Sequence, residues 1–204
     1  SFAYNETREA PVKEIDGAYY LIDNSLIPPS NLAIMIIPYN ASYSCNFYDK
    51  DQRNDIRGQL QGWASMSENL FIWMYDINFE NYLLPFMSWR SLSENYKILK
   101  ELNVFYIYNQ SSYNISSLNF SQMKQWIQTK LLWDTSLNVN VLIEEFVSVF
   151  YKEAAPFIYK YFCILEDKFK ELQENGRHQY SFNWDSTFIS KDIFSKEFLL
   201  ECKT

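Results

Sequence analysis

The 204 residues carry a net charge of -7, and 48% of them are apolar. A chain of this length and composition can bury one sizeable core, and its negative charge without basic runs disfavours binding to nucleic acid or anionic lipid. No apolar stretch approaches the roughly 20 residues that a membrane-spanning helix needs, so no membrane span is expected.

Four strand-like runs alternate with helical segments, which is typical of parallel βα units. The runs are Phe2–Asn5, Leu32–Pro38, Leu70–Tyr75 and Val104–Tyr108. The long connection Glu9–Ser30 ends in two prolines and is predicted to be irregular.

A helix is predicted after each of the last three strands, because apolar residues recur there at helical spacing. The stripes are Ile56, Leu60, Trp63 and Met66, then Leu92, Tyr96, Leu99 and Leu102, and finally Met123, Trp126, Ile127 and Leu131. Their predicted N-caps are Asp51, Ser88 or Ser91, and Ser121.

Beyond Asn138 the pattern is purely helical. We expect helices over Val139–Tyr151 and Ala154–Glu174, with Pro156 in the first turn of the second and Asn175-Gly176 at its end. The tail Tyr180–Thr204 is predicted to be an extended piece followed by a short helix.

Five N-x-Ser/Thr sequons favour a secreted or cell-surface protein if the chain enters a eukaryotic secretory route. The candidate glycan acceptors are Asn5, Asn40, Asn109, Asn114 and Asn119. The three cysteines, Cys45, Cys163 and Cys202, are compatible either with one disulfide and one thiol or with three free thiols.

Several segments, in the right order, resemble a large bacterial family, the domain of unknown function numbered 4838, which overlaps with endo-β-N-acetylglucosaminidases. Lys130–Phe146 is similar to that family's K-L-x-W-D/N-P-x-x-D/N-V run, and Phe150–Tyr161 to its Y-Y-G-x-A-A run. Ile72–Phe86 looks like W-D-Y-x-x-N-F-x-x-Y-L-x-P-F-P, and Phe2–Pro11 looks like A-Y-x-x-S/T-x-x-P-P.

This resemblance implies an α/β fold, the C-terminal half of a glycosidase-like (β/α)8 TIM-type barrel with a helical extension. Residues 1–136 would form four βα units, 137–176 a helical hairpin packed on the barrel, and 177–204 a C-terminal extension. Because a closed barrel needs eight strands, the expected partner is the remaining half of the barrel or another protein chain. Carbohydrate or the glycans of glycoproteins would be the ligands.

In such barrels the site lies where the strands end, since the βα loops meet there. The predicted sugar contacts are Tyr4, Tyr39, Tyr75, Asn78, Trp89, Asn109 and Gln110, with Trp89 placed in a polar loop. Glu6, Asn40, Glu80 and Ser111 follow the same strands.

Glycoside hydrolysis normally needs two carboxyl groups, or one acid aided by the substrate's own acetamide. This chain has Met74 and Ser111 where the resembled family commonly has acids, so catalysis does not follow from the resemblance. Asp76 is the remaining candidate acid, and the alternative interpretation is that it caps the following turn or helix. His178 is interpreted as a solvated loop residue, and no motif predicts a metal site or a cofactor.

The leading hypothesis is an extracellular glycoside-hydrolase-like domain with a carbohydrate-related role, weakly active or inactive on its own. The alternative is a non-catalytic structural or interaction domain of a larger surface glycoprotein assembly. A freestanding small-molecule enzyme has no motif in its favour.

Overall fold

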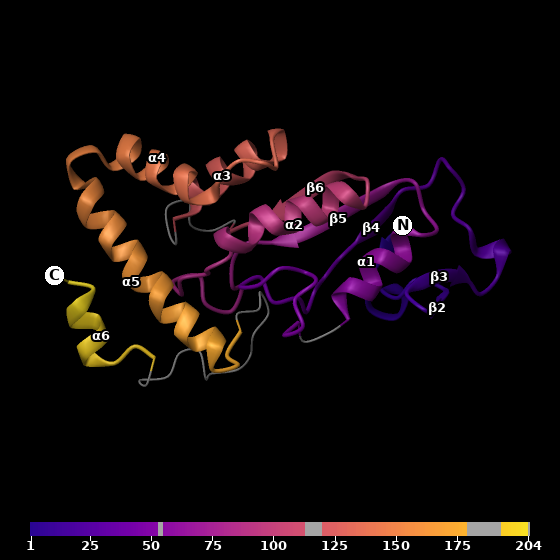
Figure 1. Cartoon of the computed structure of the whole chain (residues 1–204), viewed down its shortest axis with the longest axis horizontal. Helices are drawn as coiled ribbons and strands as arrows, with labels where there is room; N and C mark the ends of the chain where they lie inside the picture. Colours follow the sequence, from indigo (N-terminus) through magenta and orange to yellow (C-terminus); the bar gives the residue numbers. More distant parts are fainter. Residues whose placement is uncertain (53–54, 113–119, 179–192, 204) are drawn as a thin grey trace.

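The computed structural model describes residues 1–52, 55–112, 120–178 and 193–203. Its centre is a parallel sheet of β1 (Phe2–Ala3), β4 (Ile34–Ile36), β5 (Leu70–Tyr75) and β6 (Val104–Gln110), in the order β1-β4-β5-β6. Figure 1 shows these strands with helices beside them. The four predicted strands and the mixed α/β class are confirmed.

One face of this sheet forms the core. Leu70, Ile72 and Met74 of β5 are buried in the same apolar cluster as the stripes of α1 (Ile56–Ala64), α2 (Trp89–Glu101) and α3 (Ser121–Trp133). Side chains alternate between the faces of a strand, so Phe71, Trp73 and Tyr75 lie on the opposite face. That second face is partly open, because Tyr108 of β6, which pairs with Trp73, is 42% exposed.

The connection predicted to be irregular contains a hairpin, so that prediction is wrong. β2 (Val12–Ile15) pairs with β3 (Ala18–Leu21) in antiparallel fashion. Asp16 and Gly17 join them with φ values of 53° and 79°. An Asp-Gly pair with positive φ at both positions is typical of a type I′ hairpin turn, a signal present in the sequence.

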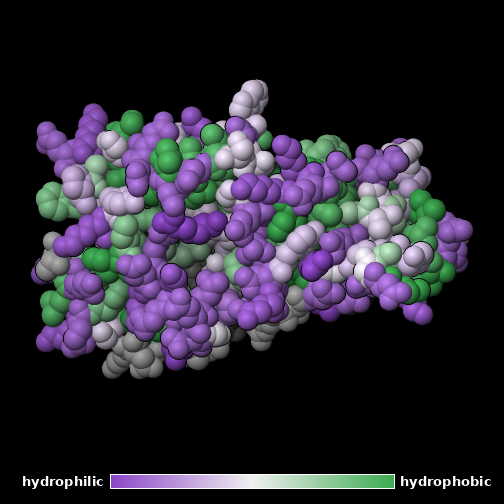
Figure 2. Space-filling view, in the orientation of Figure 1, coloured by the Kyte–Doolittle hydropathy of each residue, from purple (hydrophilic) through white to green (hydrophobic). Residues whose placement is uncertain are grey.

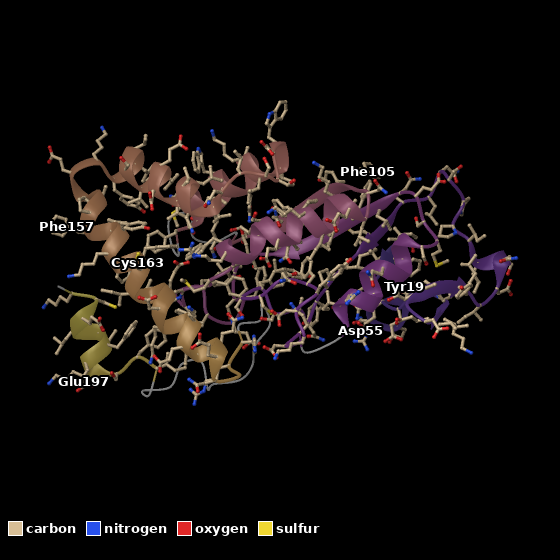
Figure 3. The ribbon with its side chains drawn as sticks, in the orientation of Figure 1. Tyr19, Asp55, Phe105, Phe157, Cys163 and Glu197 are labelled. Atoms are coloured by element: carbon tan, nitrogen blue, oxygen red, sulfur yellow. The ribbon has the colours of Figure 1, made fainter. Side chains whose placement is uncertain are left out.

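The hairpin packs on α1. A Cβ added at Gly62 of α1 would lie 3.2 Å from side-chain carbons of both Ala10 and Val12, so the absence of a side chain permits this close approach. The Tyr19 hydroxyl of β3 donates to the Gln61 amide oxygen at 3.3 Å. Tyr19 lies near Asp55, the residue that precedes α1 (Figure 3).

Apolar side chains remain exposed at the hairpin end of the molecule. Figure 2 shows hydrophobic surface gathered at that end. The exposed apolar residues in this part of the chain are Ile15, Ile22, Leu26 and Ile27, of which the last two flank or belong to a 3-10 turn over Asn24–Leu26.

Two of the predicted caps differ in the structure. The N-cap of α1 is Asp55 rather than Asp51, and its carboxylate accepts from the Gly58 N–H at 2.7 Å. Asp51 belongs to the preceding turn. The N-cap of α3 is Phe120 rather than Ser121, and it lies in the left-handed region at φ 54°. Ser88 is the N-cap of α2, as predicted, but its side chain makes no capping bond.

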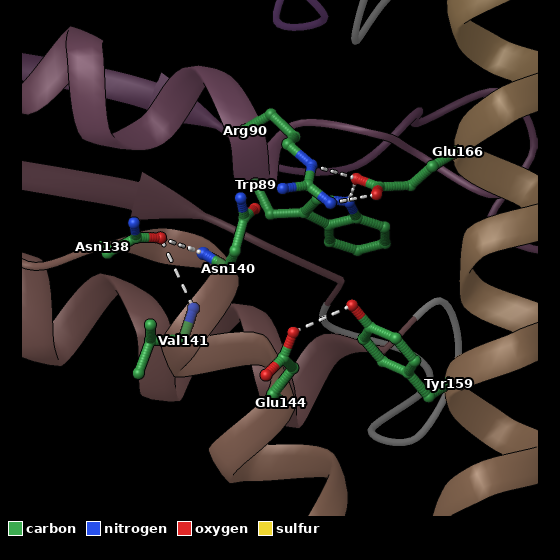
Figure 4. Close-up of polar contacts among 8 residues, drawn as sticks. All are labelled: Trp89, Arg90, Asn138, Asn140, Val141, Glu144, Tyr159 and Glu166. Carbon is green, nitrogen blue, oxygen red and sulfur yellow. Dashed lines mark hydrogen bonds and ion pairs between the residues drawn. The ribbon is translucent and has the colours of Figure 1, made fainter.

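The C-terminal helices match the prediction closely. α4 (Val139–Tyr151) leads through a 3-10 turn over Lys152–Ala154 into α5 (Ala155–Glu174), which has Pro156 in its first turn and ends before Gly176 at φ 74°. The Tyr159 hydroxyl donates to Glu144 at 3.2 Å and joins the two helices (Figure 4). The short helix α6 (Lys196–Glu201) follows beside α5 (Figure 1). None of the helices described here has the length and hydropathy required to cross a membrane.

Candidate functional site

Aromatic rings line the edge of the sheet at which the parallel strands end. Tyr4 follows β1, Tyr39 follows β4 and Tyr75 is the last residue of β5. The ring centroids of Tyr4 and Tyr39 are 5.5 Å apart, and those of Tyr39 and Tyr75 are 6.5 Å apart, both edge to face. The structure therefore brings together three residues that lie more than thirty positions apart in the sequence.

The rings continue along the open face of the sheet. Trp73 lies 6.3 Å from Tyr75 and 5.0 Å from Tyr108, measured between ring centroids. Its indole N–H donates to the amide oxygen of Gln110 at 2.9 Å, which fixes both side chains. We call Tyr4, Tyr39, Tyr75, Trp73 and Tyr108 the aromatic row.

The phenols of Tyr39 and Tyr75 remain protonated at neutral pH. Burial raises the pKa of Tyr75 well above its usual value, and the neighbouring tyrosines Tyr4, Tyr39 and Tyr108 raise it further. Burial raises the pKa of Tyr39 too, with contributions from Tyr4 and Glu80. Each hydroxyl can therefore donate as well as accept a hydrogen bond. Glu80 is exposed and close enough to act on Tyr39, so a carboxylate lies at the margin of the row.

Asp76, the candidate acid, points away from this row. It is 3% exposed, and its Oδ2 accepts from the Gln128 amide of α3 at 3.1 Å. Lys124 of α3 donates from Nζ to the Asp76 carbonyl at 2.8 Å. Asp76 does not cap the following turn, as the alternative interpretation had it; the Asn78 amide oxygen does so by accepting from the N–H groups of Glu80 and Asn81. Asp76 fastens α3 to the end of β5.

Burial is the largest influence on the ionisation of this group. It raises the pKa of Asp76, while Lys124, Gln128 and Ser111 lower it. The pKa of Lys124 falls to about 7 because the amine is buried, although Asp76 raises it. Sequence reasoning missed Lys124 and Gln128. Their signal was a lysine and a glutamine at helical spacing from Ile127 and Leu131 of the buried stripe.

The two other positions at the ends of β5 and β6 are also structural. Asn109 donates from its amide to the Tyr96 hydroxyl of α2 at 2.7 Å, so it faces the helices. Met74, which stands in place of an acid, is completely buried on that same face. A carboxylate at Met74 would lie in the core rather than among the aromatic rings.

Trp89 is not in a polar loop, and that prediction is wrong. It is the first residue of α2 and is completely buried, with its ring centroid 5.0 Å from that of Phe162 in α5. Its indole N–H donates to Glu166 at 3.1 Å, and Arg90 pairs with the same carboxylate through two nitrogens (Figure 4). Trp89 anchors α5 and offers no ring face to a ligand.

The sequons have different surroundings. Asn5 and Asn40 are exposed beside Tyr4 and Tyr39. Asn109 uses its amide nitrogen, the atom that would carry a glycan, to bond Tyr96, so a glycan there would break a contact between β6 and α2. Asn114 and Asn119 lie outside the described residues.

His178 and the cysteines complete the predicted positions. His178 is buried rather than solvated, so that interpretation is wrong, and its Nδ1 lies 3.5 Å from the hydroxyl of Ser42. Cys45, Cys163 and Cys202 are all free thiols, which resolves the alternatives left open by the sequence. Burial raises the pKa of the Cys45 thiol to about 11, so the thiolate is disfavoured at neutral pH.

The fold and this edge define a mixed α/β protein whose parallel sheet ends in an aromatic surface. The family match is more specific. The chain belongs to the family described as domain of unknown function (DUF4838), which matches residues 1–163. Comparison with curated proteins and with solved structures gave no match.

Proposed function

We propose that this chain is an extracellular, glycoside-hydrolase-like domain with a carbohydrate-related role, weakly active or inactive on its own. The observation that carries the proposal is the aromatic row, which continues over the ends of β1, β4 and β5 and onto β6. On this proposal the strands are the C-terminal half of a (β/α)8 barrel, whose ligands bind where the strands end.

The chemistry of the row suits a sugar. Aromatic rings supply apolar area at little entropic cost, and the C–H face of a pyranose can stack on them. Tyrosine hydroxyls and the Gln110 amide supply hydrogen bonds that fix the orientation of a polar ligand. Of the predicted contacts, Tyr4, Tyr39, Tyr75 and Gln110 are retained. Trp89, Asn78 and Asn109 serve the fold, while Trp73 and Tyr108 join the set.

The acids near the row support weak activity or none. A retaining or inverting mechanism usually needs two carboxyl groups flanking the glycosidic bond, or one acid aided by the substrate's own acetamide. The Asp76 carboxylate points towards α3, where it accepts from Gln128. Glu80 is a carboxylate near the row, and it raises the pKa of Tyr39. We expect little or no hydrolysis of aryl N-acetylglucosaminides, and any that occurs should not depend on Asp76. Turnover that Asp76→Asn abolished without unfolding the chain would contradict this part of the proposal.

Sugar binding can be tested on one strand. Tyr108 and Tyr106 are both exposed residues on the open face of β6, but Tyr108 contacts Trp73 whereas Tyr106 contacts Phe71, farther from the site. We expect Tyr108→Ala to weaken binding of an N-acetylglucosamine oligosaccharide by roughly 10-fold, about 1.4 kcal/mol. Tyr106→Ala is the matched control and should bind like the unmodified chain in calorimetric titration. Equal losses in both variants, or no binding to begin with, would contradict the proposal.

A non-catalytic interaction domain is the second candidate, and the edge of the sheet favours it. β6 is an outer strand of the described sheet, has no charged residue or proline, and carries Phe105 at 64% exposure (Figure 3). Exposed edge strands usually carry charged residues or proline, because these prevent unwanted pairing with other strands. The remaining half of a barrel, or another chain, would pair with β6. A longer chain from the same gene should then protect the β6 amides from hydrogen exchange, and unchanged exchange would count against pairing.

Secretion is part of the same proposal. In a eukaryotic secretory host, Asn5 and Asn40 are the described sequons that can carry glycans on the folded chain, since both side chains are exposed. Peptide mass shifts at these two positions, without one at Asn109, are the expected result.

A further inference from the structure

Lys124 is a lysine enclosed in the core between α3 and the end of β5. Its residue is 1% exposed, and its Nζ donates to the Asp76 carbonyl at 2.8 Å. The ring centroids of Phe86 and Trp89 lie 5.1 and 4.9 Å from the same nitrogen. An ammonium group has three protons to donate, so a single carbonyl and two ring faces compensate poorly for lost water.

The ionisable groups around this amine come from each element packed against it. Asp76 lies at the end of β5. In addition to burial, its charge raises the pKa of Tyr43, in the loop after β4, and of Tyr96, on α2. On the far side of Trp89, Glu166 of α5 is paired with Arg90. Burial raises the pKa of Tyr43 and Tyr96, so both remain neutral. The Asp76 carboxyl is therefore the group that can offset a charge on Lys124.

The carboxyl is itself incompletely satisfied. Oδ2 accepts from Gln128, whereas Oδ1 is buried without a hydrogen-bond partner among the described residues. A proton on the carboxyl, or its loss from the amine, removes a buried charge. Two groups on different elements thus share a site in which the neutral forms are favoured.

We propose that Lys124 and Asp76 form a proton-controlled latch that fastens α3 to the carboxyl end of β5. The loop after β5 begins at this latch and carries Phe79, whose ring lies 5.7 Å from that of Tyr75 in the aromatic row. Loosening of the latch would therefore reach the candidate site. The latch itself does not depend on whether the row binds sugar.

The direction of the pH effect follows from the two groups. Burial lowers the pKa of Lys124 to about 7, whereas an unfolded lysine titrates near 10.4, so the folded chain binds fewer protons between these values. Stability from Lys124 therefore rises as the pH increases from about 7 towards 10. Asp76 has a raised pKa, so its contribution is present at low pH and is lost as the pH rises through that pKa. Both contributions are smallest where the carboxyl has ionised and the amine is still charged, because the attraction between the two charges offsets only part of the cost of burying them.

Urea unfolding of the whole chain at pH 6 and pH 9 tests the latch. We expect the unfolding midpoint to be higher at pH 9 by roughly 1 M. Lys124→Met has a similar volume and no charge, so this rise should disappear. Lys130→Met is the matched control, since Lys130 is on the same helix but exposed and lies over the Trp126 ring. It should keep the rise.

An equal rise in the Lys124→Met variant would overturn the proposal, and so would no rise in the unmodified chain. If Lys124→Met does not fold at either pH, the titration of the Lys124 13Cε resonance in the unmodified chain decides. A midpoint close to neutrality supports the latch, and a midpoint near 10 overturns it.

Discussion

At the scale of single residues, several buried polar side chains in the described part of the chain bond a group on another element. Asn95 of α2, completely buried, accepts from the Phe47 N–H at 2.8 Å, and the Ser91 hydroxyl donates to the Tyr43 carbonyl at 2.6 Å. Asp76 and Lys124 do the same between β5 and α3. Most buried polar groups in folded proteins have partners, and in these three cases the partners come from another element. Asp76 Oδ1 and Asn95 Nδ2 are buried without one among the described residues.

The cap of α1 gives a direct test at this scale. Asp55→Ala removes the acceptor for the Gly58 N–H and should lower the free energy of unfolding by about 1 kcal/mol. Asp51→Ala, the cap predicted from sequence, should change it by less than about 0.5 kcal/mol because Asp51 precedes the helix. Thermal or urea unfolding measures both. Equal effects would contradict the assignment of Asp55 as the cap.

Individual residues were also where sequence reasoning was least complete. The apolar stripes predicted most of the buried apolar residues of α1, α2 and α3, because burial follows helical periodicity, although Trp126 is only partly buried. The partners of Asp76 could not be predicted, since Lys124 and Gln128 lie about fifty residues farther along the chain and meet it only in the folded state. Trp89 was misplaced for a related reason, as its burial depends on Phe162 of α5.

At the scale of elements, α5 is attached to α2 by one carboxylate. Glu166 accepts from the Trp89 indole N–H at 3.1 Å and from Arg90 Nε at 2.7 Å. Its side chain is 14% exposed, so water replaces these bonds poorly once they are lost. This carboxylate connects the helical extension to the units that carry the sheet.

We therefore expect Glu166→Ala to destabilise the chain by about 2 kcal/mol, in the range of hydrogen bonds to charged groups. Glu171→Ala on the same helix is the matched control. Its ion pair with Lys168 is more exposed and should contribute less than about 0.5 kcal/mol. Urea unfolding followed by tryptophan fluorescence distinguishes them, and a Glu166→Ala chain as stable as the control would contradict this attachment.

Elements were predicted more securely than the contacts between them. The continuous apolar run at Leu70–Tyr75 and the N-cap Asn138 with the stripe of α4 are local signals, and both elements occur as expected. The Asp16-Gly17 pair is an equally local signal for the hairpin β2–β3. The connection was nevertheless predicted to be irregular, because it ends in two prolines. Which faces of two elements contact each other depends on the whole fold, so a local sequence pattern cannot predict it.

At the scale of the whole molecule, the sheet has helices on one face and a partly open aromatic face on the other. The two proposed roles use different parts of this sheet: the sugar would contact the open face at the carboxyl end of the strands, and another strand would pair with the edge of β6. Family membership agrees with the resemblance found in the sequence, over residues 1–163. The proposed carbohydrate-related role rests on the aromatic row.

The most direct test uses the tryptophan indole resonances of the 15N-labelled chain during titration with an N-acetylglucosamine oligosaccharide. Trp73 lies in the aromatic row and bonds Gln110, whereas Trp89 is completely buried and Trp133 is 93% exposed at the end of α3. The account predicts a saturable shift of the Trp73 Nε1–H resonance, with those of Trp89 and Trp133 unchanged. A shift confined to Trp133, or none at any of the three, would contradict a carbohydrate site on the aromatic row.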